Sequence, residues 1–255
     1  MGVTYRSEGG VAVITLNRPE VFNSIDQRIT EGVVRGIEQA GTEARAVVIT
    51  GAGKAFCAGA DLGDLSDEYA QAGPDLETTI ATRFNPLVRG ILDSPVPVIA
   101  AINGAAAGAG MGLALACDLR VMDPNAFMMS AFINVALIPD SGTAWFLPQM
   151  VGVSRAMEIA MSGRKVPAAE ALSLGLVHRL SEAPVEEAVA WAGALADGPT
   201  GAYVATRHLI HQAVAASLAD TLDAEAVLQG SLGRRPDHLE GMSAFLEKRK
   251  PRFGA

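Results

Sequence analysis

The chain has 255 residues, of which 49% are hydrophobic and 19% are charged, so it can bury a sizeable core in one large domain or in a domain with an appendage. This composition excludes a disordered protein, and the net charge of −8 argues against a general binder of nucleic acid or of anionic membranes. Positive charge is concentrated in the C-terminal run EKRKPR, residues 247–252, which is interpreted either as a solvated tail or as a local contact for phosphate.

The first two-thirds of the sequence alternates strand and helix patterns. Strands are predicted at 11–16, 46–50, 96–102, 119–122 and 126–129. Helices are predicted at about 26–40, 76–92 and 109–116. The run AVVIT, residues 46–50, is apolar without interruption, which is typical of a strand buried on both faces. The alternation predicts an α/β fold with crossover connections.

After about residue 150 the strand patterns nearly vanish. Helices are predicted there at 154–161, 167–173, 185–196, 200–216, 219–230 and 236–247. A helical segment attached to an α/β core often serves assembly, so we expect a core at 1–195 and a C-terminal helical oligomerisation region at 196–255.

Metal binding and disulfide formation are not expected. Cys57 and Cys117 are the two cysteines, and with no signal peptide at the start they are interpreted as reduced thiols of a cytoplasmic protein. His208 and His211 lack a third ligand partner, so no metal site is predicted. The uncharged stretch 94–117 imitates a membrane span, but its prolines, asparagine and glycines favour a strand, a tight turn and a buried helix.

The sequence contains two glycine-rich turns, and neither matches a nucleotide-binding motif. GAGK at 51–54 is followed by Ala55 where a phosphate loop needs Ser or Thr, and GAGMGL at 108–113 has Leu113 where a dinucleotide motif needs Gly. What remains is two units, 47–62 and 98–115, in which a buried strand leads into small residues. Two such turns facing one pocket could direct two backbone N–H groups at a single oxygen, although each could equally be a plain tight connection.

Several segments lie in order along nearly the whole chain: NRPE (17–20), GKAFCAGADL (53–62), PVIAAING (97–104), CDLR (117–120), IPDSG (138–142), AAEALSLGLV (168–177) and FLEKRKP (245–251). Together they resemble the enoyl-CoA hydratase/isomerase (crotonase) superfamily. The resemblance implies a crotonase-like spiral of ββα units with a C-terminal helical trimerisation region. It also implies a homotrimer or hexamer and an acyl-CoA thioester substrate, with no cofactor apart from the coenzyme A of that substrate.

The resemblance also implies the site residues. The thioester oxygen would be held by the backbone amides of Ala60 and Ala109. The substrate-binding residues implied with them are Ala58, Asp61, Leu62, Gly108, Phe132, Phe245 and Lys248. Of these, Phe245 and Lys248 match positions that approach the adenine end of coenzyme A in the family. Asp61 has a second interpretation, in which its carboxylate closes its own loop through hydrogen bonds.

The sequence departs from the hydratases of this family at both of their catalytic glutamates, whose positions hold Gly112 and Phe132. Hydration must activate a water and deliver a proton, which suits two carboxylates, whereas moving a double bond from β,γ to α,β needs one base. Asp140 is then the candidate acid/base. Its surroundings, 132–152, look most like the isomerases of phenylacetate degradation that convert a ring-epoxide thioester to an oxepin, although Thr143-Ala144 stands where those have Gly-Thr.

The structural alternative for Asp140 is the N-cap of a helix that begins near Ser141, where it would stay ionised, whereas a base in an apolar pocket would have a raised pKa. Asp118 is interpreted as structural, and Asp64, Asp67 and Glu68 as a solvated face that could border the acyl tail. An apolar pocket or plain core are both open for Met128, Met129, Phe132, Trp145 and Phe146.

Three functions are therefore open: an isomerase using Asp140, a hydratase using other acids, and a non-catalytic acyl-CoA-binding relative.

Overall fold

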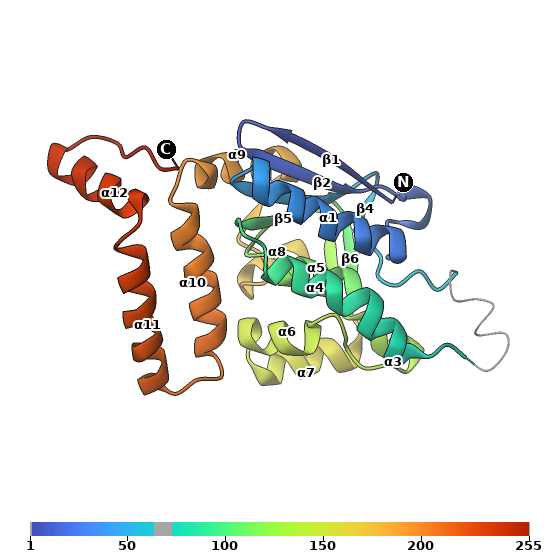
Figure 1. The fold of residues 1–255 in the computed structure, drawn as a ribbon. Helices are drawn as coiled ribbons and strands as arrows, with labels where there is room; N and C mark the ends of the chain where they lie inside the picture. The colour runs from blue at the N-terminus through green and yellow to red at the C-terminus, as the bar shows by residue number, and fades with distance from the viewer. Residues whose placement is uncertain (1, 64–72, 255) are drawn as a thin grey trace.

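A six-stranded sheet forms the centre of the computed structural model, which describes residues 2–63 and 73–254 (Figure 1). Its strands, in spatial order, are β1 (Val3–Glu8), β2 (Val11–Leu16), β3 (Ala46–Gly51), β5 (Val98–Ile102), β7 (Leu119–Met122) and β10 (Arg179–Leu180). β1 pairs antiparallel with β2, and all the other pairs are parallel. Asp64, Asp67 and Glu68 lie outside the described residues, so their predicted role stays untested.

A second sheet consists of four short strands, which alternate along the sequence with strands of the first sheet. It contains, in spatial order, β4 (Ala55–Cys57), β6 (Ala105–Ala107), β8 (Phe127–Met129) and β9 (Lys165–Pro167). β3 is followed by β4, β5 by β6 and β7 by β8, so each turn of the chain adds one strand to each sheet before a helix. This repeat is the predicted spiral of ββα units.

The helices of the core follow the paired strands or connect them. They are α1 (Gln27–Glu43), α3 (Leu76–Thr79), α4 (Asn85–Leu92), α5 (Ala109–Ala116), α6 (Thr143–Val151), α7 (Val153–Ser162), α8 (Ala168–Ser173) and α9 (Pro184–Ala196). Of these, α1 and α9 cover opposite faces of the large sheet. Short helical turns lie at η1 (Pro19–Val21), η2 (Ile80–Phe84) and η3 (Ala131–Val135).

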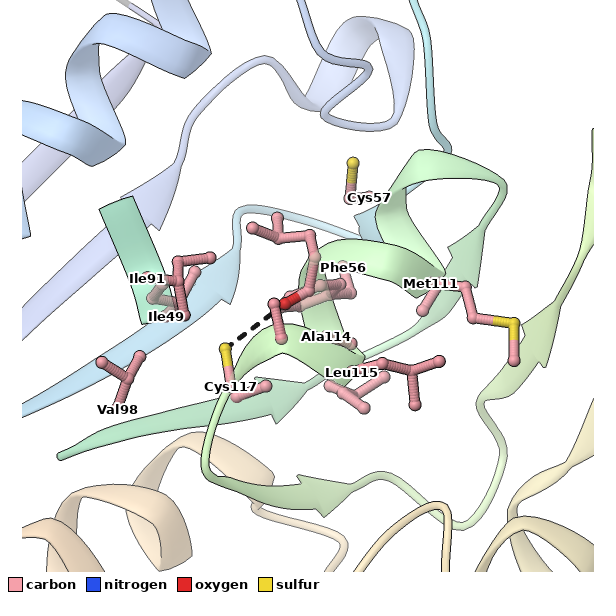
Figure 2. Close-up of a cluster of buried hydrophobic side chains, with 14 of the residues drawn as sticks. Ile49, Phe56, Cys57, Ile91, Val98, Met111, Ala114, Leu115 and Cys117 are labelled. Atoms are coloured by element: carbon pink, nitrogen blue, oxygen red, sulfur yellow. Dashed lines mark hydrogen bonds between the residues drawn. The ribbon is translucent and has the colours of Figure 1, made fainter. Parts of the chain in front are cut away.

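Strand β3 is buried on both faces, as its sequence predicts. Val47 and Ile49 point into the main core with α1, α4 and α5, and Ala46 and Val48 point to the opposite face, which is covered by α9. Figure 2 shows part of the main core, to which β3, α4 and α5 contribute Ile49, Ile91 and Met111. Because α5 is buried along its whole length, its first turn is held firmly at the end of the second sheet.

Three further helices extend away from the core: α10 (Thr200–Ala213), α11 (Leu218–Leu232) and α12 (Pro236–Glu247) (Figure 1). α11 buries none of its residues and α12 buries one, Ala244. The division of the chain into regions 1–195 and 196–255 stays a prediction, although α9 packs on the sheet and α10 to α12 follow it. Within the described part of the chain, no helix is long and apolar enough to cross a membrane.

Most predicted elements are confirmed within a few residues, and the differences have local reasons. β1, β4, β6, β9 and β10 were not expected, because most are short and have no apolar alternation of their own. The strand predicted from residue 96 begins at Val98, after Pro97. The helix expected near Ser141 begins instead at Thr143, with Gly142 as its N-cap.

Candidate active site

The first glycine-rich turn presents the backbone N–H group of Ala60, which no other described residue accepts. Ile25 donates its N–H to the carbonyl of Gly59 at 2.7 Å and accepts from the N–H of Asp61 at 3.1 Å. Ala60 lies between these two bonds, so its own N–H points to the opposite side of the chain. Among the described residues this N–H has no hydrogen-bond partner.

The second turn presents the start of a buried helix. Ala109 is the first residue of α5, and the carbonyl of Gly108 accepts the N–H groups of Met111 and Gly112 at 2.9 and 3.2 Å. The N–H groups of a first helical turn have no intrahelical acceptor and favour a nearby negative charge. The N–H of Ala109 has no partner among the described residues, so it is available to a ligand oxygen.

The two turns touch each other at Gly59. This residue has a φ of +101°, and a Cβ placed on it would lie 2.9 Å from the carbonyl oxygen of Ala107 and 3.4 Å from the N atom of Ala109. A side chain at this position would therefore collide with the second turn. The glycine brings Ala60 and Ala109 to one place, as the resemblance implied.

A cavity of about 480 Å³ opens beside these two turns. Its walls are mostly apolar and come from both turns, from α3 with the following turn η2, and from the segment 131–140. The lining residues are Ala58, Gly59, Ala60, Leu62, Leu76, Glu77, Thr79, Ile80, Phe84, Gly108, Ala109, Ala131, Phe132, Val135, Leu137, Ile138 and Asp140. Ala58, Leu62, Gly108 and Phe132, which were expected to bind substrate, all line it.

A widened helical turn shapes one wall of the cavity. Pro86 has no N–H to donate to Thr82, and the turn Ile80–Phe84 just before it is a π-helix in which the N–H of Asn85 reaches back to Ile80. Both Ile80 and Phe84 line the cavity. The sequence interpretation missed them, and the proline inside a predicted helix was the signal that could have drawn attention to this wall.

Asp140 faces the cavity and is not a helix cap. Its carboxylate accepts a hydrogen bond from the hydroxyl of Ser141 at 2.7 Å, while α6 starts at Thr143 with no side chain on its first amides. The capping alternative is therefore wrong, because the left-handed residues Ser141 and Gly142 separate Asp140 from the helix. Burial raises the pKa of Asp140, and the bond from Ser141 opposes that effect.

Neither of the two positions that hold glutamates in hydratases of the family carries a carboxylate here. A Cβ at Gly112 would lie 2.8 Å from the Cβ of Ser141 and 2.9 Å from Oγ1 of Thr143, besides overlapping the carbonyl oxygen of Ser141. Phe132 presents an apolar ring to the cavity. Glu77 is the one titratable side chain besides Asp140 among the described lining residues, and it is exposed on α3.

Asp61 and Asp118 have structural partners. Asp61 is absent from the cavity lining, and its carboxylate forms an ion pair with Arg18 at 2.7 Å and accepts the N–H of Gly63 at 3.1 Å. This supports the loop-closing interpretation over the substrate-binding one. Asp118 accepts from the N–H of Val98 at 2.8 Å and from Arg207 at 3.1 Å, which agrees with the structural role expected.

Phe245 and Lys248 do not lie at the cavity of their own chain. Both belong to the end of α12, which lies at the opposite side of the molecule from α3 (Figure 1). Phe245 is 76% exposed. Neither residue lines the cavity beside Asp140, and their expected contact with coenzyme A stays a prediction.

The basic tail and the apolar residues Met128, Trp145 and Phe146 also lie away from the cavity beside Asp140. Arg249 pairs with Glu240 and Glu247, both at 2.6 Å, so the tail folds back on α12. Met128 is fully buried in the core. Trp145 and Phe146 line a separate cavity of about 400 Å³ between α6 and α10 and do not reach the one beside Asp140. The described residues contain no group of three His, Cys, Asp or Glu side chains that could hold a metal ion.

The fold and the site define an enzyme class built on a ββα spiral. A family model described as enoyl-CoA hydratase/isomerase matches residues 6–255. The chain is 42% identical to a "Probable enoyl-CoA hydratase" of Rhodobacter capsulatus, over 98% of this chain and 97% of that protein. It is 38% identical to the "1,2-epoxyphenylacetyl-CoA isomerase" of Escherichia coli K12, over 96% and 95% of the two chains.

A solved structure agrees with these sequence relatives. The crystal structure titled "putative Enoyl-CoA hydratase/isomerase" from Mycobacterium abscessus superposes with a TM-score of 0.93 at 36% identity and covers 99% of both chains. The chain therefore belongs to the enoyl-CoA hydratase/isomerase superfamily, the crotonase family that its motifs resemble. It is an enzyme of the enoyl-CoA isomerase/hydratase type.

Proposed function

We propose that the protein is an enoyl-CoA isomerase that moves a double bond from the β,γ to the α,β position, with Asp140 as its acid/base. The observation that carries the proposal is the position of Asp140, a partly buried carboxylate with a raised pKa in an apolar cavity that also contains Ala60 and Ala109. Burial of this kind is what adjusts a carboxylate for proton transfer.

The reaction needs no group beyond these. The carboxylate of Asp140 takes a proton from the α-carbon, and the electrons of that C–H bond move onto the thioester oxygen, where the N–H groups of Ala60 and Ala109 stabilise the dienolate. The carboxylic acid then returns the proton to the γ-carbon. The electrons shift back, the α,β double bond forms, and Asp140 is again ionised.

The cavity walls support an apolar acyl group. Leu62, Ile80, Phe84 and Phe132 surround the space, so a hydrocarbon chain or a ring is accepted and a strongly polar group is disfavoured. The similarity to the Escherichia coli isomerase makes a ring-epoxide thioester the first ring substrate to test. A place in phenylacetate degradation is part of this proposal.

The second candidate function is hydration, which one observation favours: Glu77 lines the same cavity and supplies a second carboxylate. The experiment supplies a 3-enoyl-CoA and a 2-enoyl-CoA separately to the wild-type protein, to Asp140→Asn and to Glu77→Gln. Isomerisation of the former that is lost in Asp140→Asn and kept in Glu77→Gln supports our proposal. Hydration of the latter that needs Glu77 supports the hydratase. Binding of either thioester without turnover would favour the non-catalytic relative.

We further propose that the protein assembles as a homotrimer or hexamer in the cytoplasm. Apolar side chains of α10 to α12 are exposed in the single chain, among them Ile210, Leu218, Val227, Leu239 and Leu246. Such a face is stabilised when a second copy covers it. Light scattering should give three or six times the chain mass of 26.4 kDa. A monomer would contradict the proposal.

A further inference from the structure

Ser141, the residue that follows the candidate base, has an unusual backbone conformation. Its φ is +50°, in the left-handed region that residues with a Cβ rarely adopt, and it is only 4% exposed. This conformation turns its side chain back onto the preceding residue, so that its Oγ donates to Oδ1 of Asp140 at 2.7 Å. Backbone strain of this kind persists only where the surroundings enforce it.

Helix α5 supplies the surroundings that enforce it. The carbonyl oxygen and the Cβ of Ser141 lie against Gly112, at a place where a Cβ on that glycine would approach the Cβ of Ser141 to 2.8 Å. The segment is fixed from the other side by the carbonyl of Asp140, which accepts the N–H of Thr143 at 2.9 Å. Gly112 thus does more than omit a hydratase carboxylate, because its bare backbone makes the room that Ser141 occupies.

We propose that Ser141 is a positioning residue, whose hydroxyl holds Oδ1 of Asp140 and stabilises the ionised carboxylate, so that Oδ2 is left as the proton acceptor. The proposal rests on the function proposed above. No described residue donates a hydrogen bond to Oδ2. A hydroxyl that donates to a carboxylate favours its charged form, so the bond from Ser141 opposes the effect of burial on the pKa of Asp140.

Few other charges act on this carboxylate. Helices α5 and α6 and the turn η3 carry no Asp, Glu, Lys, Arg or His. The loop 58–63 carries Asp61, which is paired with Arg18, and α3 carries Glu77 at the rim of the cavity. The turn η2, which also lines the cavity, carries Arg83. Burial raises the pKa of Asp140, and within the described part of the chain the hydroxyl of Ser141 is the one neutral donor that lowers it.

Two substitutions separate the hydroxyl from the backbone. Ser141→Ala removes the hydroxyl and keeps the Cβ, whereas Ser141→Gly removes the hydroxyl and suits the positive φ, so it should fold at least as well as the wild type. Ser94→Ala is the control, because Ser94 is equally buried and donates to the carbonyl of Val96 at 2.7 Å, away from the cavity.

The first measurement is a ¹³C NMR titration of the Asp140 carboxyl carbon, assigned by its absence in Asp140→Asn. We expect the pKa of Asp140 to rise by about one unit in Ser141→Ala and Ser141→Gly, and to stay unchanged in Ser94→Ala. The second is the pH dependence of kcat for a 3-enoyl-CoA. Its acid limb should move to higher pH by the same amount and kcat should fall by about tenfold on the plateau, with KM changed less than twofold.

An unchanged carboxyl titration in both Ser141 variants would overturn the proposal, as would full kcat and an unmoved acid limb in Ser141→Gly. A purely structural role predicts that second pattern, because glycine restores the backbone. The NMR titration does not depend on turnover. A wild-type protein that isomerises no 3-enoyl-CoA would refute the proposed function, and a raised carboxyl pKa in the variants would still support the action of Ser141 on Asp140.

Discussion

Adding a single methyl group at Gly112 should disturb the site through packing alone. In Gly112→Ala the new Cβ would lie 2.8 Å from the Cβ of Ser141 and 2.9 Å from Oγ1 of Thr143, and it would overlap the backbone oxygen of Ser141. These atoms belong mostly to backbone or to its immediate substituent, so the segment between Asp140 and α6 must shift. Overpacking of this kind costs about 1–3 kcal/mol, and for a chain of this length each kcal/mol lowers Tm by roughly 2–4 °C.

The assay compares urea unfolding and 3-enoyl-CoA isomerisation in Gly112→Ala and in Gly193→Ala. Gly193 is a matched control on helix α9, where a new Cβ meets nothing within 4 Å, so alanine should stabilise the helix by about 0.5–1 kcal/mol. We expect Gly112→Ala to lose stability and most of its isomerase activity, since a shift of about 1 Å at a catalytic group can cost roughly a hundredfold in rate. Wild-type stability and activity in Gly112→Ala would refute this account of the packing.

Three further predictions concern single groups. Burial raises the pKa of Asp140, so the ionised carboxylate destabilises the folded protein once the pH exceeds the ordinary pKa of an aspartate. Asp140→Asn should therefore be at least as stable as the wild type at neutral pH and should lose this advantage below about pH 4. A lower Tm than that of the wild type at neutral pH would contradict this prediction. Asp61→Asn breaks an ion pair whose two side chains are each 11% exposed. Since Arg18 keeps its second partner, Asp26, the loss should be about 1–3 kcal/mol in urea unfolding with KM unchanged, whereas Glu31→Gln in an exposed pair should cost little; a raised KM at wild-type stability would return Asp61 to the substrate site. Burial raises the pKa of Cys57 and of Cys117 to about 12, so a thiol reagent should label neither in the native protein and both after denaturation, and rapid native labelling would be the contrary result.

Much of the fold could be predicted from the sequence because its central strands carry their own pattern. The apolar run of β3 and the small residues after β3 and β5 predict buried parallel strands that end in tight turns. β4 and β6 carry no such pattern, since Ala-Phe-Cys and Ala-Ala-Ala become strands only by pairing within the second sheet, β4 with β6 and β6 with β8.

Some residues of the candidate site could be predicted from the sequence and others could not. Ala60, Ala109 and Asp140 were predicted because motifs fix their turns, and the structure brings all three to one cavity. Ile80 and Phe84 were not, because apolar residues on a helix look the same whether they face a core or a cavity. Phe245 and Lys248 were expected at the substrate, but their position relative to it depends on where α10 to α12 place the end of the chain, which a single sequence does not specify.

The central claim is that Asp140 transfers the proton, and it is tested most directly by isomerisation of a 3-enoyl-CoA by the wild-type protein and by Asp140→Asn under the same conditions. The product is a conjugated thioester, so its formation can be followed by absorbance. Our account predicts turnover by the wild-type protein and a loss of at least about a hundredfold in kcat for Asp140→Asn, with the acyl-CoA still bound. Isomerisation that survives in Asp140→Asn would contradict it.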